Sequence, residues 1–204
     1  MKLVIIEGPD NTGKTTVINE LIGLYDNVHY IHCQKPKSKD PIKAALEQQQ
    51  NFEKLVKLIK ALKEHIVPQL VILDRSWIGE YVYGCKYRGN GDEYVIEMIE
   101  KCYSELYDMK FSSPFSSSWF EYYTILLTVD NPEFCVKNDD GKSLSKADID
   151  NVKDEVKRFD DIFSKDINKS NGLCKVIVNN GMKFRPKEDI LNDVLKIINY
   201  HTIG

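Results

Sequence analysis

The stretch GPDNTGKT, residues Gly8 to Thr15, decides the fold of this chain. It matches the pattern G-x-x-x-x-G-K-[ST] at every position, and it lies between an apolar run over 2–7 and a helical pattern over 14–24. In such a loop, backbone N–H groups turn inward around phosphate oxygens, and the start of the following helix favours their negative charge. The sequence therefore predicts a loop that binds the phosphates of a nucleotide.

Each position of this loop has an expected part in holding ATP. Lys14 can reach the β- and γ-phosphate oxygens, and the hydroxyl of Thr15 can bind Mg²⁺. Asn11 occupies a position where some loops have a third glycine, and Asn tolerates left-handed backbone angles better than most residues. The expected ATP-binding residues in and beside the loop are Gly8, Asn11, Thr12, Gly13, Lys14, Thr15 and Thr16.

The composition is that of a single globular domain. The 204 residues include 28 basic and 31 acidic side chains, and the net charge of −3 argues against a broad basic face for nucleic acid. No apolar run approaches the roughly 18 residues that a membrane span needs, and the N-terminus lacks the pattern of a signal peptide. Five scattered cysteines without metal-ligand spacing indicate ordinary thiols, so we expect a cytoplasmic protein.

Short apolar runs alternate with helical patterns along the chain. Strands are expected over 2–7, 28–32, 70–73, 124–129 and 174–178. Helices are expected over 14–24, 41–66, 77–84, 92–108, 148–168 and 187–200, with a loop over 109–123. Together with the phosphate loop, this alternation predicts an α/β protein of the P-loop NTPase fold. Its five-stranded parallel sheet has helices on both faces, and the ligand site lies at the carboxyl ends of the strands.

The residues after the third expected strand exclude a GTPase. A GTPase would carry D-x-x-G at that point, whereas Asp74 is followed by Arg75, Ser76 and Trp77. The N-K-x-D pattern of GTPases is also absent, because its nearest match, over 168–171, ends in Asn and follows no apolar strand. A motor or remodelling ATPase would need a longer chain. Small-molecule kinases are the remaining class of proteins that uses this loop.

Two segments resemble the thymidylate kinase family. EGPDNTGKTT, residues 7–16, is similar to the family's start E-G-x-D-x-x-G-K-[ST]-T, and DRSWIGEYVYGCKYRG, residues 74–89, is similar to its Asp-Arg motif. The viral deoxynucleoside monophosphate kinases look closest, through Glu80 followed by Tyr83 and Gly84 and through a composition rich in Lys, Ile and Asn. The detailed resemblance covers about a quarter of the chain.

The resemblance implies roles for four residues. Asp74 would hold Mg²⁺ through water, and a helix N-cap is an alternative role for its carboxylate. Arg75 and Arg88 would grip the acceptor phosphate, for which a guanidinium fork is suited, and a structural ion pair is the alternative for Arg75. Asp10 would lie near the sugar hydroxyl and phosphate of the acceptor, or would stabilise the loop. Only four of the 28 basic residues are arginine, and two of them stand here.

The acceptor-site segment is expected over 33–66. Where the family has Phe-Pro-Arg, this chain has QKPK over 34–37, so Lys35 or Lys37 would replace the arginine. That departure weakens the expectation of strict thymidylate specificity. Tyr83, or an aromatic residue such as Phe52, is a candidate to stack on the acceptor base, and packing in the core is the alternative for both.

A small lid is expected over 136–147. Lids of this family bring arginine to the transferring phosphoryl group, whereas this segment offers Lys137, Lys142 and Lys146. Lys137 and Lys142 are the candidate catalytic cations, and a solvated loop is the alternative. Arg158, on the next expected helix, would reach inward or pair with Asp154 or Asp161.

These features lead to one expected function. The segment 179–182, after the last expected strand, would contact adenine, and Asn180 completes the expected ATP site. We expect residues 1–204 to form one kinase domain that transfers the γ-phosphoryl group of ATP, with Mg²⁺, to a deoxynucleoside monophosphate, with dTMP first in rank. A deoxynucleoside kinase and a nucleotide-binding regulator without transfer activity are the alternatives.

The expected partners are small nucleotides, without nucleic acid or membrane. The resemblance also implies a homodimer, and for a viral protein the compartment would be the cytoplasm of the host.

Overall fold

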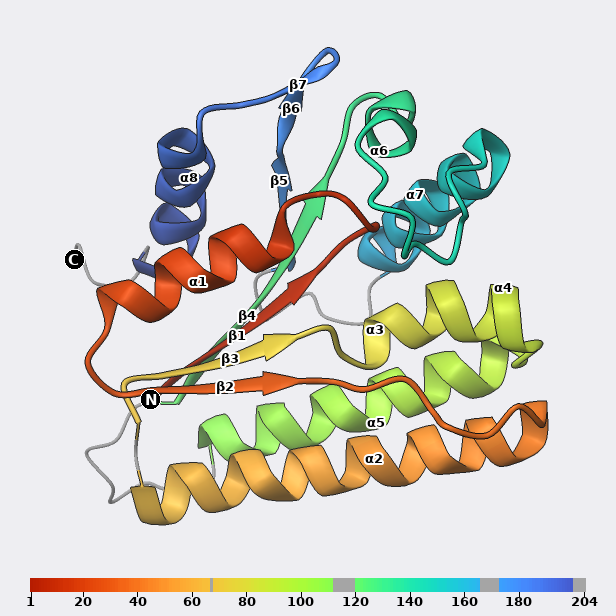
Figure 1. The fold of residues 1–204 in the computed structure, drawn as a ribbon. Coiled ribbons are helices and arrows are strands. Elements are labelled where there is room, and N and C mark those ends of the chain that lie inside the picture. Colours follow the sequence, from red (N-terminus) through yellow and green to blue (C-terminus); the bar gives the residue numbers. More distant parts are fainter. Residues whose placement is uncertain (67, 112–119, 166–172, 200–204) are drawn as a thin grey trace.

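The computed structural model describes residues 1–66, 68–111, 120–165 and 173–199. Its centre is a five-stranded parallel sheet in the order β2-β3-β1-β4-β5 (Figure 1). The strands are β1 (Lys2–Glu7), β2 (Val28–His32), β3 (Leu70–Asp74), β4 (Glu121–Thr128) and β5 (Leu173–Ile177). The predicted α/β class and five-stranded parallel sheet are therefore confirmed.

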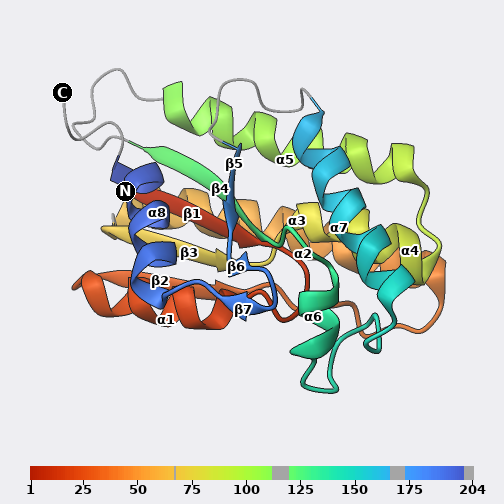
Figure 2. The same cartoon turned by 90° about the horizontal axis from the view of Figure 1, so that it is seen from above.

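Helices cover both faces of the sheet. One face carries α1 (Lys14–Leu24) and α8 (Lys187–Asn199), and the other carries α2 (Pro41–Ala61) and α5 (Asp92–Phe111). Figure 2 looks from above onto the face with α1 and α8, and α2 passes behind the strands. Parallel strands are joined by crossover connections that pass over a face of the sheet. The helices of these connections therefore cover both faces and bury the strands.

The central strand β1 shows how the sequence builds two cores. Leu3 and Ile5 pack with α2 and α5, whereas Val4 and Ile6 pack with α1 and α8. Successive side chains of a strand point to opposite faces, so a continuous apolar run serves both cores at once.

The carboxyl ends of the central strands meet at one edge of the sheet. In the pairing register, Asp74 lies beside Ile6 of β1 on one side and beside His32 of β2 on the other. The backbone continues the sheet by one step beyond β3, because the N–H of Arg75 donates to the carbonyl of Ile6 at 3.0 Å. The residues just after β1, β2 and β3 are therefore neighbours in space, as predicted for the ligand site.

The helical segment after β3 differs from its prediction. Instead of one helix over 77–84, the chain forms α3 (Trp77–Gly79), a π-helix η2 (Glu80–Gly84) and α4 (Cys85–Arg88) without a break. The extent of the predicted helix over 41–66 is correct, but its last turn is also a π-helix, η1 (Leu62–Ile66). Hydrophobic periodicity predicts that a helix exists, but it does not distinguish α from π turns.

The predicted loop over 109–123 is wrong at both ends. α5 continues to Phe111, and β4 begins at Glu121 rather than at 124. Tyr122 and Tyr123 are both buried and belong to the cores on opposite faces of the sheet. Aromatic residues have high strand propensity, which here outweighs the serine-rich surroundings. The positions 112–119 of this prediction lie outside the described residues.

The remaining elements frame the expected lid. α6 (Glu133–Lys137) precedes it and α7 (Ile149–Ser164) follows it, so residue 136 at its predicted start belongs to a helix. The predicted helix over 148–168 ends at Ser164, and its last positions, 166–168, lie outside the described residues, as does position 200 of the last predicted helix.

A short hairpin follows β5 and was not expected. It consists of β6 (Asn179–Asn180) and β7 (Lys183–Phe184). In the described part of the chain, no helix combines the length and the apolar character that crossing a membrane requires.

Candidate nucleotide-binding site

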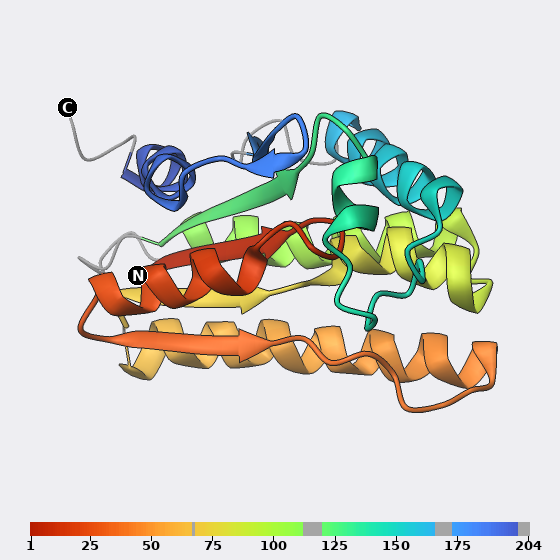
Figure 3. The ribbon, with the colours of Figure 1, turned by 45° about the horizontal axis from the view of Figure 1, so that its top comes forward.

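A cleft of about 1080 Å³ opens at the carboxyl ends of the strands. Its walls come from the phosphate loop, the chain after β2, the helical segment after β3 and the loop between α6 and α7, which crosses this end of the molecule in Figure 3. From the phosphate loop and the chain after β2, it is lined by Asp10, Asn11, Gly13, Lys14, Thr15, His32, Cys33, Gln34, Lys35, Pro36, Lys37 and Gln48. From the other two walls, it is lined by Arg75, Ser76, Gly79, Glu80, Tyr83, Arg88, Asp140, Lys142, Ser143 and Leu144.

The phosphate loop has the backbone that its sequence requires. Gly8 has φ 144°, and a Cβ atom there would lie 2.1 Å from the carbonyl oxygen of Leu127. Gly13, which precedes α1, has φ 75°, and Asn11 has φ 65°. Left-handed angles of this kind are accessible to glycine and tolerated by asparagine, so these residue types allow the turn. Gly8 and Thr12 shape the loop without lining the cleft.

The ammonium group of Lys14 is folded back onto its own loop. Its Nζ donates to the carbonyls of Gly8 and Pro9 at 2.9 and 2.6 Å. Burial and the nearby Arg75 lower the pKa of Lys14 to about 8. Thr15 is exposed at the start of α1 and lines the cleft. A bound phosphate would give the Lys14 ammonium an anionic partner in place of neutral carbonyls.

Arg75 and Asp10 form an ion pair at the mouth of the phosphate loop. Nη2 of Arg75 donates to Oδ1 of Asp10, and its guanidinium carbon lies 5.2 Å from the centre of the Tyr83 ring. Arg75 has φ 67°, an uncommon angle for this residue type. The structural ion pair considered for Arg75 is therefore present, and all three side chains also line the cleft.

Arg88 forms a second ion pair on the same wall. Its Nη2 donates to Oε2 of Glu80, whose other carboxylate oxygen accepts from Asn90 at 2.7 Å. Burial raises the pKa of Glu80, against the opposing effect of Arg88. Both arginines that sequence reasoning assigned to the acceptor phosphate thus reach the cleft, each with a carboxylate beside it.

Asp74 is bonded to the neighbouring strand. Its Oδ2 accepts from the hydroxyl of Tyr30 at 2.9 Å and lies 2.8 Å from Nδ1 of His32. The helix N-cap considered for Asp74 is instead Ser76, whose side chain accepts from the N–H of Ile78. A water-mediated contact from Asp74 to Mg²⁺ would use Oδ1, because Oδ2 has these two partners. His32, which lines the cleft, was not among the expected site residues.

A buried carboxylate holds the segment after β3 in place. Oε1 of Glu7 accepts from the hydroxyl of Ser76 at 2.7 Å and from the N–H of Gly79 at 3.2 Å. Burial raises the pKa of Glu7, and its side chain is inaccessible to solvent. Sequence reasoning passed over this residue, although a glutamate at the end of an apolar strand is unusual enough to have marked it.

The acceptor-site segment contributes Lys35 and Lys37 to the cleft, together with Gln48 of α2. Phe52 does not reach it. Its ring is 2 % exposed and packs edge-on against Trp77, with ring centres 6.2 Å apart. Phe52 therefore belongs to the core. Tyr83 also packs in that core, with 5 % of the residue exposed, but unlike Phe52 it lines the cleft.

The lid segment is tied to the phosphate loop. Nδ2 of Asn11 donates to Oδ1 of Asp139 at 3.0 Å and to the carbonyl of Cys135 at 3.4 Å. Lys142 lines the cleft and is highly exposed, with Nζ 3.9 Å from Asp140. Lys137 is exposed at the end of α6 and does not line the cleft.

Arg158 does not reach the cleft. Its guanidinium pairs with Asp154 and Asp92 and lies over the ring of Tyr81. Of the two arrangements considered for Arg158, the structure has the acidic pairing, with Asp154 and with a residue of α5 that sequence reasoning had not named.

The hairpin after β5 lies beside the phosphate loop. Phe184 packs edge-on against Phe134 of α6, with ring centres 4.6 Å apart, and a Cβ atom on Gly13 would lie 3.4 Å from the Phe184 ring. Asn179 fixes the hairpin, since its Nδ2 donates to the carbonyl of Gly181 at 2.9 Å. Asn180 is exposed on the hairpin and does not line the cleft.

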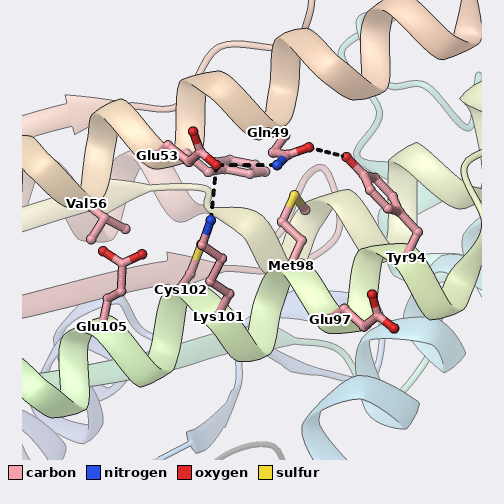
Figure 4. Close-up of a pocket in the computed structure, with 10 residues that line it drawn as sticks. Gln49, Glu53, Val56, Tyr94, Glu97, Met98, Lys101, Cys102 and Glu105 are labelled. Atoms are coloured by element: carbon pink, nitrogen blue, oxygen red, sulfur yellow. Dashed lines mark hydrogen bonds and ion pairs between the residues drawn. The ribbon is translucent and has the colours of Figure 1, made fainter.

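A second, smaller cavity of about 160 Å³ lies between α2 and α5 (Figure 4). A polar bridge crosses it, in which Tyr94 donates to Gln49 at 2.7 Å and Lys101 donates to Glu53 at 3.1 Å. Its remaining lining is partly apolar, with Val56, Met98 and Cys102 among the residues drawn. It lies apart from the phosphate loop and contributes nothing to the nucleotide site.

The described ranges contain no group of three or more His, Cys, Asp or Glu side chains arranged to hold a metal ion. A Mg²⁺ ion in this cleft would therefore need phosphate oxygens among its ligands, as is usual for this ion. The exposed hydroxyl of Thr15 beside Lys14 fits such an ion, because it stands where phosphates would enter.

No family model and no curated protein sequence matches the chain. Solved structures match it over nearly its whole length. The fold is that of the P-loop NTPases. The structure of thymidylate kinase from Candida albicans, an enzyme of broad substrate specificity, has a TM-score of 0.65 at 18% identity. The match covers 98% of this chain and 92% of that one.

Two further structures share this P-loop NTPase fold. Thymidylate kinase from Ehrlichia chaffeensis has a TM-score of 0.59 at 15% identity, with 96% of this chain and 97% of that one covered. The YorR protein from Bacillus subtilis, crystallised with phosphorylated GDP, has a TM-score of 0.61 at 17% identity, with 99% of both chains covered. At identities of 15–18%, these similarities establish the fold, and the reaction has to be inferred from the residues of the cleft.

Proposed function

We propose that this protein is a nucleoside monophosphate kinase that transfers the γ-phosphoryl group of ATP to a deoxynucleoside monophosphate. One observation carries the proposal: a single cleft joins a complete phosphate loop to two arginines, Arg75 and Arg88. The loop suits the donor, and the arginines suit an acceptor that itself carries a phosphate. A cleft of about 1080 Å³ is large enough for both nucleotides to meet.

In this proposal the chain acts through positioning and charge. Lys14 would turn from its loop carbonyls to the β- and γ-phosphates of ATP, and Arg75 and Arg88 would align the acceptor phosphate. A lid cation would approach the transferring group; Lys142 lines the cleft, while Lys137 would have to move with the lid to reach it. Mg²⁺, bound through Thr15 and through water on Asp74, would supply charge neutralisation at the phosphates. Reactions of this class need no covalent intermediate with the protein.

The acceptor is proposed to be a monophosphate rather than a nucleoside. A nucleoside 5′-hydroxyl needs a free carboxylate as base, whereas the three described carboxylates that line the cleft each have a cation nearby. Asp10 and Glu80 are each paired with an arginine, and Asp140 lies 3.9 Å from Nζ of Lys142. A monophosphate is already ionised and needs cations instead. dTMP ranks first because the chain resembles thymidylate kinases in its motifs and shares their fold, while Lys35 and Lys37 stand where relatives have arginine.

The donor site is proposed to extend toward the hairpin. Asn180 and its neighbours lie close to the phosphate loop and would contact adenine through their backbone, with Phe184 beside Gly13.

A coupled assay of ADP release tests this proposal. The purified protein is given ATP and Mg²⁺ with a panel of deoxynucleosides and their monophosphates. We expect ADP release with monophosphates, highest with dTMP, and loss of release on removal of Mg²⁺ with EDTA. Release with nucleosides alone would identify a deoxynucleoside kinase, and ATP binding without release would identify a regulator.

The protein is also proposed to form a homodimer in a reducing cytoplasm. Large apolar side chains are exposed on the two long helices of one face, namely Leu46 and Leu58 on α2 and Tyr94, Tyr107 and Phe111 on α5. A second copy of the chain would cover these side chains. All five cysteines are free thiols, which fits a reducing compartment. Sedimentation equilibrium with wild type and a Leu58→Lys variant tests this proposal. A monomeric wild type at tens of micromolar would overturn it.

A further inference from the structure

The carboxylate of Glu80 is enclosed by polar partners. Its side chain is 4 % exposed, Oε2 accepts from Arg88, and Oε1 accepts from Asn90 at 2.7 Å. A buried carboxylate is costly unless its oxygens are paired, and both oxygens of Glu80 have a donor. The chain bends back to supply the second donor, because the N–H of Asn90 donates to the carbonyl of Gly84 at 3.2 Å.

Gly84 makes room for this carboxylate. A Cβ atom at position 84 would lie 2.2 Å from Oε1 of Glu80 and 2.8 Å from Nδ2 of Asn90. The backbone of Gly84 is ordinary for a helix, with φ −68° and ψ −48°, so its conformation alone does not call for glycine. The glycine is therefore required by the position of the Glu80 side chain.

The π-helix brings Glu80 and Arg88 to the same face. In a regular α-helix of 3.6 residues per turn, residues eight apart lie about 80° from each other around the axis. Here the N–H of Cys85 donates to the carbonyl of Glu80, five residues earlier. This wider turn takes up more residues and so reduces the angle between positions 80 and 88. The ion pair depends on this local change of helix type, and π turns are frequent at functional sites.

Arg88 has donors to spare for a ligand. A guanidinium group has five N–H donors, and one nitrogen, Nη2, is bonded to Glu80. Its Nε is buried and, within the described residues, has no hydrogen-bond partner, so a ligand in the cleft would use the remaining donors of Nη1 and Nη2. The side chain lines the cleft on the same wall as Arg75 and Tyr83. The Glu80 carboxylate thus restrains one side of the guanidinium while the group faces the cleft.

We propose that Glu80 is a positioning residue that holds Arg88 in the orientation needed to bind the acceptor phosphate, with Gly84 and Asn90 holding Glu80. This inference rests on the proposed function, in which Arg88 grips that phosphate. Glu80 lies in the wall of the cleft, but both of its oxygens are bonded to Arg88 and Asn90, so in this proposal it acts through Arg88.

The test compares four single variants and one double variant in the coupled assay and in dTMP binding by isothermal titration calorimetry. Arg88→Ala removes the phosphate contact, Glu80→Gln keeps the shape but not the charge, and Gly84→Ala displaces the carboxylate. Glu53→Gln is the matched control, because it removes the carboxylate of the exposed ion pair with Lys101, outside the cleft. Thermal unfolding of every variant accompanies the kinetics.

We expect Glu80→Gln and Gly84→Ala to raise the KM for dTMP about tenfold and the KM for ATP less than twofold, with Glu53→Gln unchanged. The double variant Glu80→Gln/Arg88→Ala should bind dTMP no more weakly than Arg88→Ala alone, because Glu80 affects dTMP binding only by orienting Arg88, which is already absent. A merely structural role would lower the unfolding temperature and leave the two KM values in their wild-type ratio.

The outcomes separate the two proposals. Turnover of dTMP by wild type, with an unchanged KM for dTMP in Glu80→Gln and a raised one in Arg88→Ala, would overturn the positioning role alone. Absence of both dTMP turnover and dTMP binding in wild type would overturn the proposed function and this inference together.

Discussion

Arg75 and Asp10 are joined by an ion pair across 65 positions of sequence. The pair connects the residue after β3 to the phosphate loop, so it joins two walls of the cleft. Part of the Arg75 guanidinium is therefore already bonded before any proposed acceptor binds. The remaining donors face the cleft beside the Tyr83 ring, 5.2 Å from the guanidinium carbon.

We predict that Arg75→Ala raises the KM for the acceptor by about 10- to 100-fold, the range expected for the loss of a charge-assisted hydrogen bond. The KM for ATP should change by a factor of two or three. Arg75→Lys keeps the charge but loses the fork, and should lie between the two. Steady-state kinetics with each substrate varied in turn measures this split, and equal losses for both substrates would show that Arg75 serves the loop and not the acceptor.

Two glycine variants should have opposite effects on stability. Gly8→Ala places a Cβ atom 2.1 Å from the carbonyl of Leu127 at φ 144°, so it should lower the free energy of unfolding by about 2 kcal/mol or more and abolish ATP binding. Gly23→Ala, in α1 with open space around it, should raise that free energy by about 0.5–1 kcal/mol. Urea unfolding measures both variants. A Gly8→Ala protein as stable as wild type would contradict the loop geometry.

The bonds from Asn11 to the lid segment predict a change in lid mobility. Hydrogen bonds from Ser143 and Asn11 lower the pKa of Asp139, so its carboxylate is charged at neutral pH. Asn11→Gly keeps the left-handed backbone but removes the bonds, so trypsin should cleave after Lys142 about five times faster. The Asn11→Asp variant should be cleaved faster still, because the carboxylates at positions 11 and 139 would then repel each other. Cleavage at the wild-type rate in both variants would show that Asn11 does not hold the lid.

A buried carboxylate on α7 predicts a pH dependence of stability. Glu155 is 1 % exposed and accepts from the hydroxyl of Tyr87, and burial raises the pKa of Glu155 from 4.5 to about 7. The folded state therefore binds a proton more tightly than the unfolded state. The contribution of Glu155 to stability is present below pH 4.5, falls as the pH rises to about 7, and changes little above that pH.

Glu155→Gln removes this titrating carboxyl group and therefore its pH-dependent contribution to stability. The free energy of unfolding of wild type minus that of Glu155→Gln should fall by about 1 kcal/mol per pH unit between pH 5 and pH 7. Urea unfolding at half-unit steps of pH measures the difference, in which other titrating groups cancel. A difference independent of pH would show that Glu155 is ionised in both states.

Local patterns were enough to predict the sheet and the phosphate loop. An apolar run such as 2–7 indicates a strand that is buried on both faces. The loop pattern from Gly8 to Thr15 specifies backbone angles that few other residue types allow. Both depend on neighbours in sequence, so spacing and residue type carry the information. The resemblance of residues 74–89 to thymidylate kinases assigned Arg75 and Arg88 to one phosphate, and both side chains line the same cleft.

The tertiary structure decided which side chains meet. Glu80 reaches Arg88 only because the helix widens into a π turn, and His32 reaches Asp74 because β2 and β3 pair in one register. The sequence allowed Phe52 either to line the site or to pack in the core, and its contact with Trp77 shows that it packs in the core. Periodicity fixes neither the type of a helical turn nor the register of distant strands, since both are set by packing over the whole domain. The phosphate loop is therefore a property of the sequence, and the charge pairs that line the cleft are a property of the fold.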